Sequence, residues 1–194
     1  MTNTRTLLCA AILAATSAAA SAGDTFTNPV IRRSAPDPTV IRADDGHFYL
    51  YSTEDTPNTP IYRSDNLVDW TLISTAFSDT SRPSWNPKGG IWAPDINKIG
   101  DKYVLYYSKS EWMGLKDAGV GVATADRPEG PFTDHGCIVS YHNTGVWCSI
   151  DPFFIEDEGR KYLIWGSYWD TFGIELTADG LSVKPGARKV HIAS

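Results

Sequence analysis

Short apolar runs rich in aromatic and β-branched residues recur along the chain, and a turn signal separates the two runs of each pair. The most similar strings are FYLYS at 48–52, YVLYYS at 103–108 and YLIWGS at 162–167. Each follows a shorter apolar run and a glycine-containing pair: Asp45-Gly46, Ile99-Gly100 or Glu158-Gly159. Two apolar runs joined by such a pair predict a β-hairpin. The repetition therefore predicts three equivalent hairpins.

A second, weaker hairpin pattern follows each of the three. The paired runs are 61–64 with 70–73, 120–123 with 128–132, and 172–176 with 179–183. Together the patterns predict three units of four strands, and no amphipathic helix is evident after the N-terminal segment. Repeated four-stranded units predict a β-propeller, because one such sheet cannot bury both of its faces alone.

The number of units bears on how much of a propeller this chain would form. Propellers close with about four to eight blades, so three units cannot form a ring. The chain stops at 191–194 without a recognisable turn or closing strand. We therefore expect an all-β fold of about three blades, truncated from a larger propeller.

The first 22 residues have the features of a secretory signal peptide. Arg5 gives a positive start, residues 7–20 are apolar or small, and residues 20–22 (ASA) fit a small-x-small cleavage site. The apolar run is too short to span a bilayer. We expect a secreted or periplasmic protein in which residues 23–194 form the N-terminal part of the propeller domain.

Charge and residue composition narrow the set of partners. The chain carries 17 Lys and Arg against 23 Asp and Glu, a formal net charge of −6, without a basic cluster. This argues against nucleic acids and anionic membranes as partners. Seven tryptophans and nine tyrosines suit either a β-sheet core or a surface on which sugars stack. For Cys137 and Cys148, a disulfide and two free thiols are equally open.

Two aspartates open predicted units, and each is followed by proline. Asp37 begins the first unit and Asp151 the third, while Asp95 follows a proline as Asp37 does and is placed at the same position of the second unit. Such positions in successive blades converge on the propeller axis, where carboxylates would interact. An Asp before Pro can also simply open a strand or cap a turn.

Three motifs occur in this order: APDPTVI at 35–41, IWAPDI at 91–96 and SIDPFF at 149–154. In combination they resemble glycoside hydrolase family 43, and segments 121–132 and 166–176 are similar to its second and third blades. The resemblance covers residues 28–190. It implies a five-bladed β-propeller that acts on arabinan, xylan or arabinoxylan, in a family that inverts configuration.

The resemblance also implies roles for individual residues. Asp37 matches the general base that activates a water, and Asp151 matches the carboxylate that orients the catalytic acid and keeps its pKa raised. Asp95 is not one of the family's three acids and is expected to be structural. The implied substrate-binding residues are Asp37, Trp92, Ser149, Ile150, Asp151, Ser167 and Trp169, with core packing an equal alternative for Trp92.

The catalytic acid itself is not among the matched motifs. In the family it is a Glu of the following blade, and Glu129, Glu158 and Glu175 stand in other contexts. No cofactor is required, and the four histidines show no metal-ligand spacing. A structural Ca²⁺ at the propeller axis of the full-length enzyme, with a ligand from a later blade, stays open.

We therefore expect an endo-1,5-α-L-arabinanase-like, inverting hydrolase of plant cell-wall arabinan that works as a monomer. Segment 155–186 resembles endo-arabinanases more than β-xylosidases. α-L-Arabinofuranosidase or β-xylosidase action is the alternative within the family. A non-catalytic glycan-binding propeller is the alternative of another class, although binding alone does not need two aspartates.

Because the acid is missing from the matched motifs, residues 1–194 alone are expected to hydrolyse linear arabinan very slowly or not at all. The release of reducing ends by the purified chain and by its Asp37→Asn variant measures this. Hydrolysis by the chain that disappears in Asp37→Asn would refute the prediction.

Overall fold

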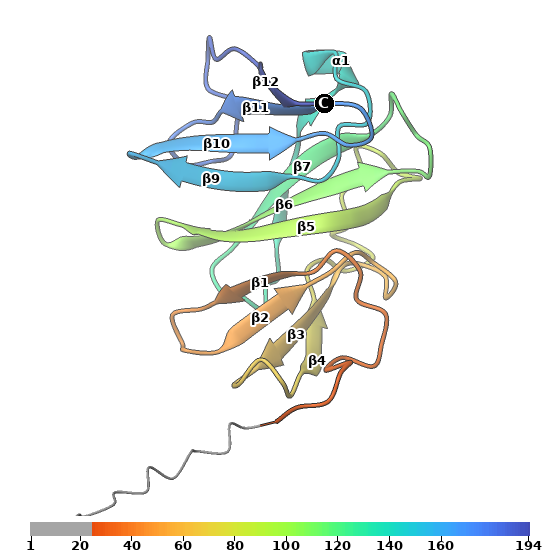
Figure 1. The fold of residues 1–194 in the computed structure, drawn as a ribbon, viewed down its shortest axis with the longest axis vertical. Helices are drawn as coiled ribbons and strands as arrows, with labels where there is room; N and C mark the ends of the chain where they lie inside the picture. Colours follow the sequence, from red (N-terminus) through yellow and green to blue (C-terminus); the bar gives the residue numbers. More distant parts are fainter. Residues whose placement is uncertain (1–24) are drawn as a thin grey trace, which may run out of the picture.

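Residues 25–194, which the computed structural model describes, form three antiparallel sheets of four strands each (Figure 1). The first sheet contains β1 (Thr39–Arg42), β2 (Phe48–Tyr51), β3 (Pro60–Ser64) and β4 (Thr71–Thr75). The second contains β5 (Gly90–Ile99), β6 (Lys102–Ser110), β7 (Gly119–Ala125) and β8 (Thr133–Ser140). The third contains β9 (Phe153–Asp157), β10 (Arg160–Trp165), β11 (Thr171–Glu175) and β12 (Val190–Ala193).

These sheets confirm the prediction of an all-β chain built from three four-stranded units. A single helical turn, α1 (Tyr141–Thr144), joins the second sheet to the third. No helix of the described part of the chain is long and apolar enough to cross a membrane. The signal peptide predicted at residues 1–22 lies outside the described residues, and closure into five blades stays a prediction.

The hairpins form because their turns supply the backbone that tight connections need. In the third sheet, Asp157 pairs with Arg160, and only Glu158 and Gly159 lie between them. Both have positive φ, 49° and 76°, as a two-residue hairpin turn of type I′ requires. Glycine adopts this conformation without steric cost, which explains the acidic-Gly signal in the sequence.

The last strands of the second and third sheets both differ from the sequence prediction. In the second sheet, β8 begins at Thr133, after the run 128–132 that was expected to form it. In the third sheet, segment 179–183 makes only an isolated bridge, Leu176 to Val183, and the fourth strand is β12. Pro185 has no N–H to continue a ladder, and Gly186, with φ of 80°, turns the chain back along β11. The prediction that the chain ends without a further strand is therefore wrong.

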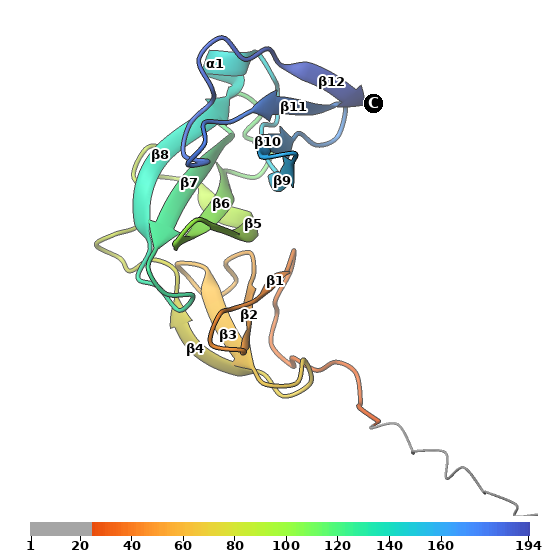
Figure 2. The same cartoon turned by 90° about the vertical axis from the view of Figure 1, so that its left-hand side faces the viewer.

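The three sheets follow one another along an arc, with their first strands on its inner side (Figure 2). β1 contacts β5, and β5 contacts β9, so these inner strands are direct neighbours. The fourth strands β4 and β8 lie on the outer side of the arc (Figure 2). This arrangement brings equivalent ends of β1, β5 and β9 toward a common region.

The second sheet is buried on both faces, and β6 shows why its sequence is almost continuously apolar. Tyr103, Leu105 and Tyr107 pack toward the first sheet in one core cluster, and Val104 and Tyr106 pack toward the third in another. Successive side chains of a strand point to opposite faces, so a strand between two cores needs apolar residues at every position.

Gly121 on β7 is required by the close approach of Tyr107. A Cβ at Gly121 would lie 2.8 Å from Cε2 of Tyr107 and closer still to its hydroxyl end. We expect Gly121→Ala to lower the free energy of unfolding by about 1–3 kcal/mol through overpacking.

Urea unfolding of the chain measures this effect, with Lys88→Ala in an exposed loop as the control, expected to stay within about 0.5 kcal/mol. An unchanged midpoint for Gly121→Ala would show that the Tyr107 ring can move aside.

Candidate active site

Asp37 and Asp151 line the same cavity, which has a volume of about 420 Å³. It lies where the inner strands of the three sheets meet, and all three sheets contribute to its wall. Among the other lining residues are Thr53, Trp92, Ile150 and Ser167. The structure thus brings the two predicted aspartates into one cavity.

The two aspartates occupy equivalent backbone positions, and their conformation is unusual. Asp37, Ala93 and Asp151 each precede a proline, and all have positive φ, of 49°, 40° and 57°. Such a conformation costs about 1–3 kcal/mol for a residue with a Cβ. In the second sheet, the position equivalent to Asp37 and Asp151 is therefore occupied by Ala93. The placement of Asp95 at this position from the sequence is wrong by two residues.

A repeated hydrogen bond from the preceding sheet holds two of these three residues, Ala93 and Asp151. The Thr53 hydroxyl accepts from the Ala93 N–H at 2.7 Å, and the Ser108 hydroxyl accepts from the Asp151 N–H at 2.8 Å. Thr53 lies two residues after Tyr51, which pairs with β1, and Ser108 lies two residues after Tyr106, which pairs with β5. The bond is thus a property of the repeat, and it joins consecutive sheets.

Thr53 also orients the first aspartate directly. Its hydroxyl donates to Oδ2 of Asp37 at 2.6 Å while it accepts from Ala93. With both hydrogen-bonding directions in use, the hydroxyl cannot rotate freely. One carboxylate oxygen of Asp37 is therefore held, and the other is left for the cavity.

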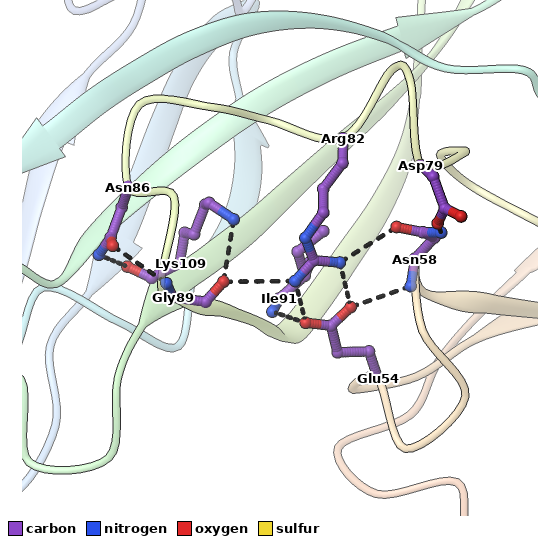
Figure 3. A network of polar contacts seen from close by, with 8 residues as sticks. All are labelled: Glu54, Asn58, Asp79, Arg82, Asn86, Gly89, Ile91 and Lys109. Atoms are coloured by element: carbon purple, nitrogen blue, oxygen red, sulfur yellow. Dashed lines mark hydrogen bonds and ion pairs between the residues drawn. The ribbon is translucent and has the colours of Figure 1, made fainter.

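The segment that carries Thr53 is anchored by a partly buried ion pair between Glu54 and Arg82 (Figure 3). Glu54 also accepts from the N–H groups of Asn58 at 2.9 Å and Ile91 at 2.7 Å. Burial alone would raise the pKa of Glu54, but the hydrogen bonds from Arg82 and these amides hold it below its usual value. The network ties the first sheet to the start of β5.

Lys109 extends this network on the second sheet (Figure 3). Its side chain is fully buried, and its ammonium donates to the Gly89 carbonyl at 2.9 Å. Burial and the neighbouring charge of Arg82 lower the pKa of Lys109 to about 8. The loop before β5, which leads to Trp92, is thereby held in place.

The electrostatics of Asp151 differ from those of an exposed carboxylate. Partial burial raises its pKa, and the negative charge of Asp37 raises it further, while a hydrogen bond from Ser167 opposes both effects. Asp37 and Asp151 therefore interact through the cavity. Carboxyl groups that influence each other in one partly buried cavity are typical of acid–base catalytic sites.

Asp95 has a structural role, as expected from the resemblance. Its Oδ2 accepts from the Phe154 N–H at 2.7 Å, which links β5 to β9, and from Asn97 at 2.9 Å. Thr39 makes the equivalent link one sheet earlier by accepting from Ile96 N–H at 3.4 Å. Burial raises the pKa of Asp95.

Three of the remaining predicted substrate-binding residues reach the cavity: Trp92, Ile150 and Ser167. The Trp92 ring depends on Gly90, where any Cβ would overlap the indole nitrogen. Ser149 does not reach the cavity. It is fully buried, and its hydroxyl donates to the Val146 carbonyl at 3.0 Å and accepts from Trp165 Nε1 at 3.3 Å.

Trp169 also lies away from this cavity, in a second pocket. On the sequence alone, Trp169 is expected near the same end of the blades as the acids, and the resemblance implies that it contacts the sugar. The intervening Tyr168 has φ of 70°, and this turn of the backbone sends Tyr168 and Trp169 to different pockets.

Sequence reasoning missed part of the cavity wall. Glu111, Trp112, Met113 and Tyr168 line it, and Trp112 is 79% exposed. The first three belong to the β6–β7 connection, and Tyr168 belongs to the equivalent β10–β11 connection of the third sheet; both lie outside the strand motifs of the repeat. Their only sequence signal is an aromatic residue within a polar turn.

Cys137 and Cys148 carry free thiols, which decides between the two alternatives left open by the sequence. Cys148 lines the cavity, where burial raises its pKa. Within residues 25–194, no group of three His, Cys, Asp or Glu side chains is arranged to hold a metal ion.

Because Asp37 and Ser167 act on the pKa of Asp151 in opposite directions, their substitutions should shift this pKa in opposite directions. Asp37→Asn removes a negative charge and should lower the pKa of Asp151, whereas Ser167→Ala removes a hydrogen bond and should raise it. Carbon-13 NMR titration of the aspartate carboxyls measures both shifts.

Asp101→Asn, in the β5–β6 turn, is the control and should leave the pKa of Asp151 unchanged. If the pKa of Asp151 stays the same in Asp37→Asn, the two carboxyls do not share one electrostatic environment.

The sequence matches known proteins over most of its length. It is 33% identical over 150 residues to the probable arabinan endo-1,5-alpha-L-arabinosidase A of Aspergillus flavus, covering 75% of this chain and 46% of that protein. It is 32% identical over 155 residues to the arabinan endo-1,5-alpha-L-arabinosidase C of Emericella nidulans, covering 78% and 48%. The chain thus spans about half the length of these relatives.

The fold also matches solved structures. The alpha-L-arabinanase of Cellvibrio cellulosa superposes with a TM-score of 0.73 at 27% identity, covering 84% of this chain and 54% of that one. An exo-1,5-alpha-L-arabinanase from a bovine ruminal metagenomic library superposes with a TM-score of 0.67 at 28% identity, covering 84% and 57%. The family model of glycosyl hydrolases family 43 matches residues 26–194, and the chain belongs to this family.

Proposed function

We propose that the whole protein is an inverting hydrolase of α-1,5-linked arabinan, and that this chain supplies two of its three catalytic carboxyls. The observation that carries the proposal is the meeting of Asp37 and Asp151 in one cavity, from equivalent positions of the first and third sheets. Membership of family 43 supports glycoside hydrolysis as the chemistry.

Asp37 is suited to the role of general base. One of its oxygens is held by Thr53, so the other can accept a proton from a water in the cavity. The water oxygen then bonds to the anomeric carbon as the bond to the leaving sugar oxygen breaks, and a carboxylic acid protonates that oxygen. By resemblance to the family, the acid is a Glu outside the motifs identified in this chain.

Asp151 is suited to keeping that acid protonated. Its negative charge would disfavour ionisation of a neighbouring carboxylic acid. Ser108 holds the Asp151 backbone from the other side at 2.8 Å. The residue therefore acts on the proton donor and does not take part in bond cleavage itself.

Arabinan as the substrate is supported by the relatives. The curated relatives are named arabinan endo-1,5-alpha-L-arabinosidases, and a similar structure, with a TM-score of 0.72 at 26% identity, is that of the Cellvibrio cellulosa enzyme complexed with arabinohexaose. Trp92 offers an indole face in the cavity, on which a neutral sugar ring can stack.

Exo action on the same polymer is a second candidate, because the chain is also 28% identical to an exo-1,5-alpha-L-arabinanase. The two modes are separated by their products, since an endo enzyme releases mixed oligosaccharides early and an exo enzyme releases one short product.

The proposal extends to the architecture, export and oligomeric state of the whole protein. We propose that the three sheets are blades of a five-bladed propeller, that residues 1–22 direct export, and that the enzyme works as a monomer without a required cofactor. These features rest on the resemblance and on the sequence of the N-terminal segment.

The proposal is tested by measuring hydrolysis of linear arabinan by the whole protein and its Asp37→Asn variant. We expect kcat to fall by at least about 100-fold in the variant, because the loss of a general base removes a factor of about 10²–10⁴. The control Asp101→Asn carries the same change at a distant turn and should keep full activity.

An aryl β-xyloside serves as the competing substrate. Cleavage of the xyloside without cleavage of arabinan would contradict the proposed substrate. Full arabinan hydrolysis by Asp37→Asn would contradict the proposed role of this residue. Sugar binding without hydrolysis of either substrate would support the non-catalytic alternative.

A further inference from the structure

A second pocket of about 360 Å³ lies beside the candidate active site. Trp147 and Trp169 form its exposed sides, with 45% and 55% of their surface accessible. Leu115, Val146 and Phe172 give it an apolar floor, and its volume falls in the range of about 300–1,000 Å³ that small-molecule sites occupy. The proposed catalytic chemistry makes no use of this pocket.

The two pockets share a wall that is one residue thick. Three separate segments each give one residue to the active-site cavity and the next or preceding one to the second pocket. These pairs are Gly114 and Leu115, Cys148 and Trp147, and Tyr168 and Trp169. Consecutive Cα atoms are about 3.8 Å apart, so a ligand longer than one pocket can cross the wall.

The backbone of this wall is strained in all three segments. Met113, Cys148 and Tyr168 all line the active-site cavity, and they have positive φ of 61°, 50° and 70°. A Cβ makes this conformation costly, and such residues cluster at functional sites. The positive-φ residues thus lie in the segments whose neighbouring residues line different pockets.

The aromatic rings of the second pocket are held before any ligand binds. Trp147 packs against Tyr141 with ring centroids 5.5 Å apart and lies under the Lys116 ammonium at 4.9 Å. Trp169 packs against Tyr168 at 5.9 Å. Fixed rings lose little conformational freedom on binding, which favours a stacking ligand.

The charges around the pocket already have partners within the chain. Lys189 donates to the Thr144 carbonyl at 2.7 Å, and Asp170 is hydrogen-bonded to His191 at 2.8 Å. Lys116 lies over two aromatic rings. An uncharged ligand with apolar C–H faces therefore suits the pocket better than an ionic one.

We propose that Trp147 and Trp169 form a distal sugar-binding subsite that holds a neutral polysaccharide chain continuing out of the active-site cavity. This inference rests on the proposed function, since the polymer is the arabinan assigned to the catalytic site. The subsite makes affinity depend on chain length, because only an oligosaccharide that spans both pockets reaches the two tryptophans.

Calorimetric titration with arabinotriose and arabinohexaose tests the proposal. All proteins carry Asp37→Asn so that neither sugar is cleaved. We expect Trp147→Ala and Trp169→Ala each to weaken arabinohexaose binding by about three- to tenfold, as loss of an aromatic contact does, and to leave arabinotriose binding within about twofold.

Two further variants serve as controls. Trp70→Ala removes a tryptophan of the β3–β4 connection, where it donates to the Leu67 carbonyl at 2.9 Å, and should change neither affinity. Trp169→Phe keeps an aromatic ring and should retain most of the arabinohexaose affinity.

Three outcomes would overturn the subsite. If both alanine variants bind arabinohexaose normally while Trp92→Ala weakens both sugars, the subsite fails and the proposed function stands. If the alanine variants weaken both sugars equally, the two tryptophans belong to the catalytic subsite. If the parent chain binds neither sugar, the proposed function and the subsite fail together.

Discussion

A hydroxyl-to-amide hydrogen bond between consecutive sheets is the interaction on which the candidate site depends. Thr53 holds the Ala93 N–H and Ser108 holds the Asp151 N–H at the same position of the repeat. Each bond stabilises a residue whose positive φ would otherwise be unfavourable. The same bond thus positions one sheet against the next, and at Asp151 it holds the backbone of an aspartate of the candidate site.

This interaction also explains how two aspartates from different sheets reach one cavity. The apolar clusters on the two faces of the second sheet bring the three inner strands together. Hydrophobic packing is not directional, so it cannot by itself orient a carboxyl. The hydrogen bonds of Thr53 and Ser108 supply the direction, and the partly buried pair of Glu54 and Arg82 keeps the Thr53 segment in place.

Much of the fold could be predicted from the sequence because buried strands appear as short runs of aromatic and β-branched residues and tight turns require glycine. β6 and its neighbours were therefore predictable, and Asp37 and Asp151 were recognisable from their motifs. The fourth strand of the third sheet was not, because segment 179–183 has a turn-and-strand pattern, while the observed β12 lies beyond Pro185 and Gly186.

The rest of the site depends on backbone geometry that single residues do not reveal. Asp95 shares the Pro-Asp pattern of Asp37, but the proline that follows Ala93 marks the equivalent position. Ser149 stands two residues before Asp151, yet its side chain points into the core. Trp169 is separated from the cavity by the turn at Tyr168. In each case a shift of one or two residues reverses which way a side chain faces.

A crystal structure of the chain with arabinohexaose would test the central proposal most directly. The predicted result is a sugar residue between the carboxyl groups of Asp37 and Asp151, with the Thr53 and Ser108 hydrogen bonds intact. Carboxyl groups that point away from each other, or a sugar bound only elsewhere, would contradict it.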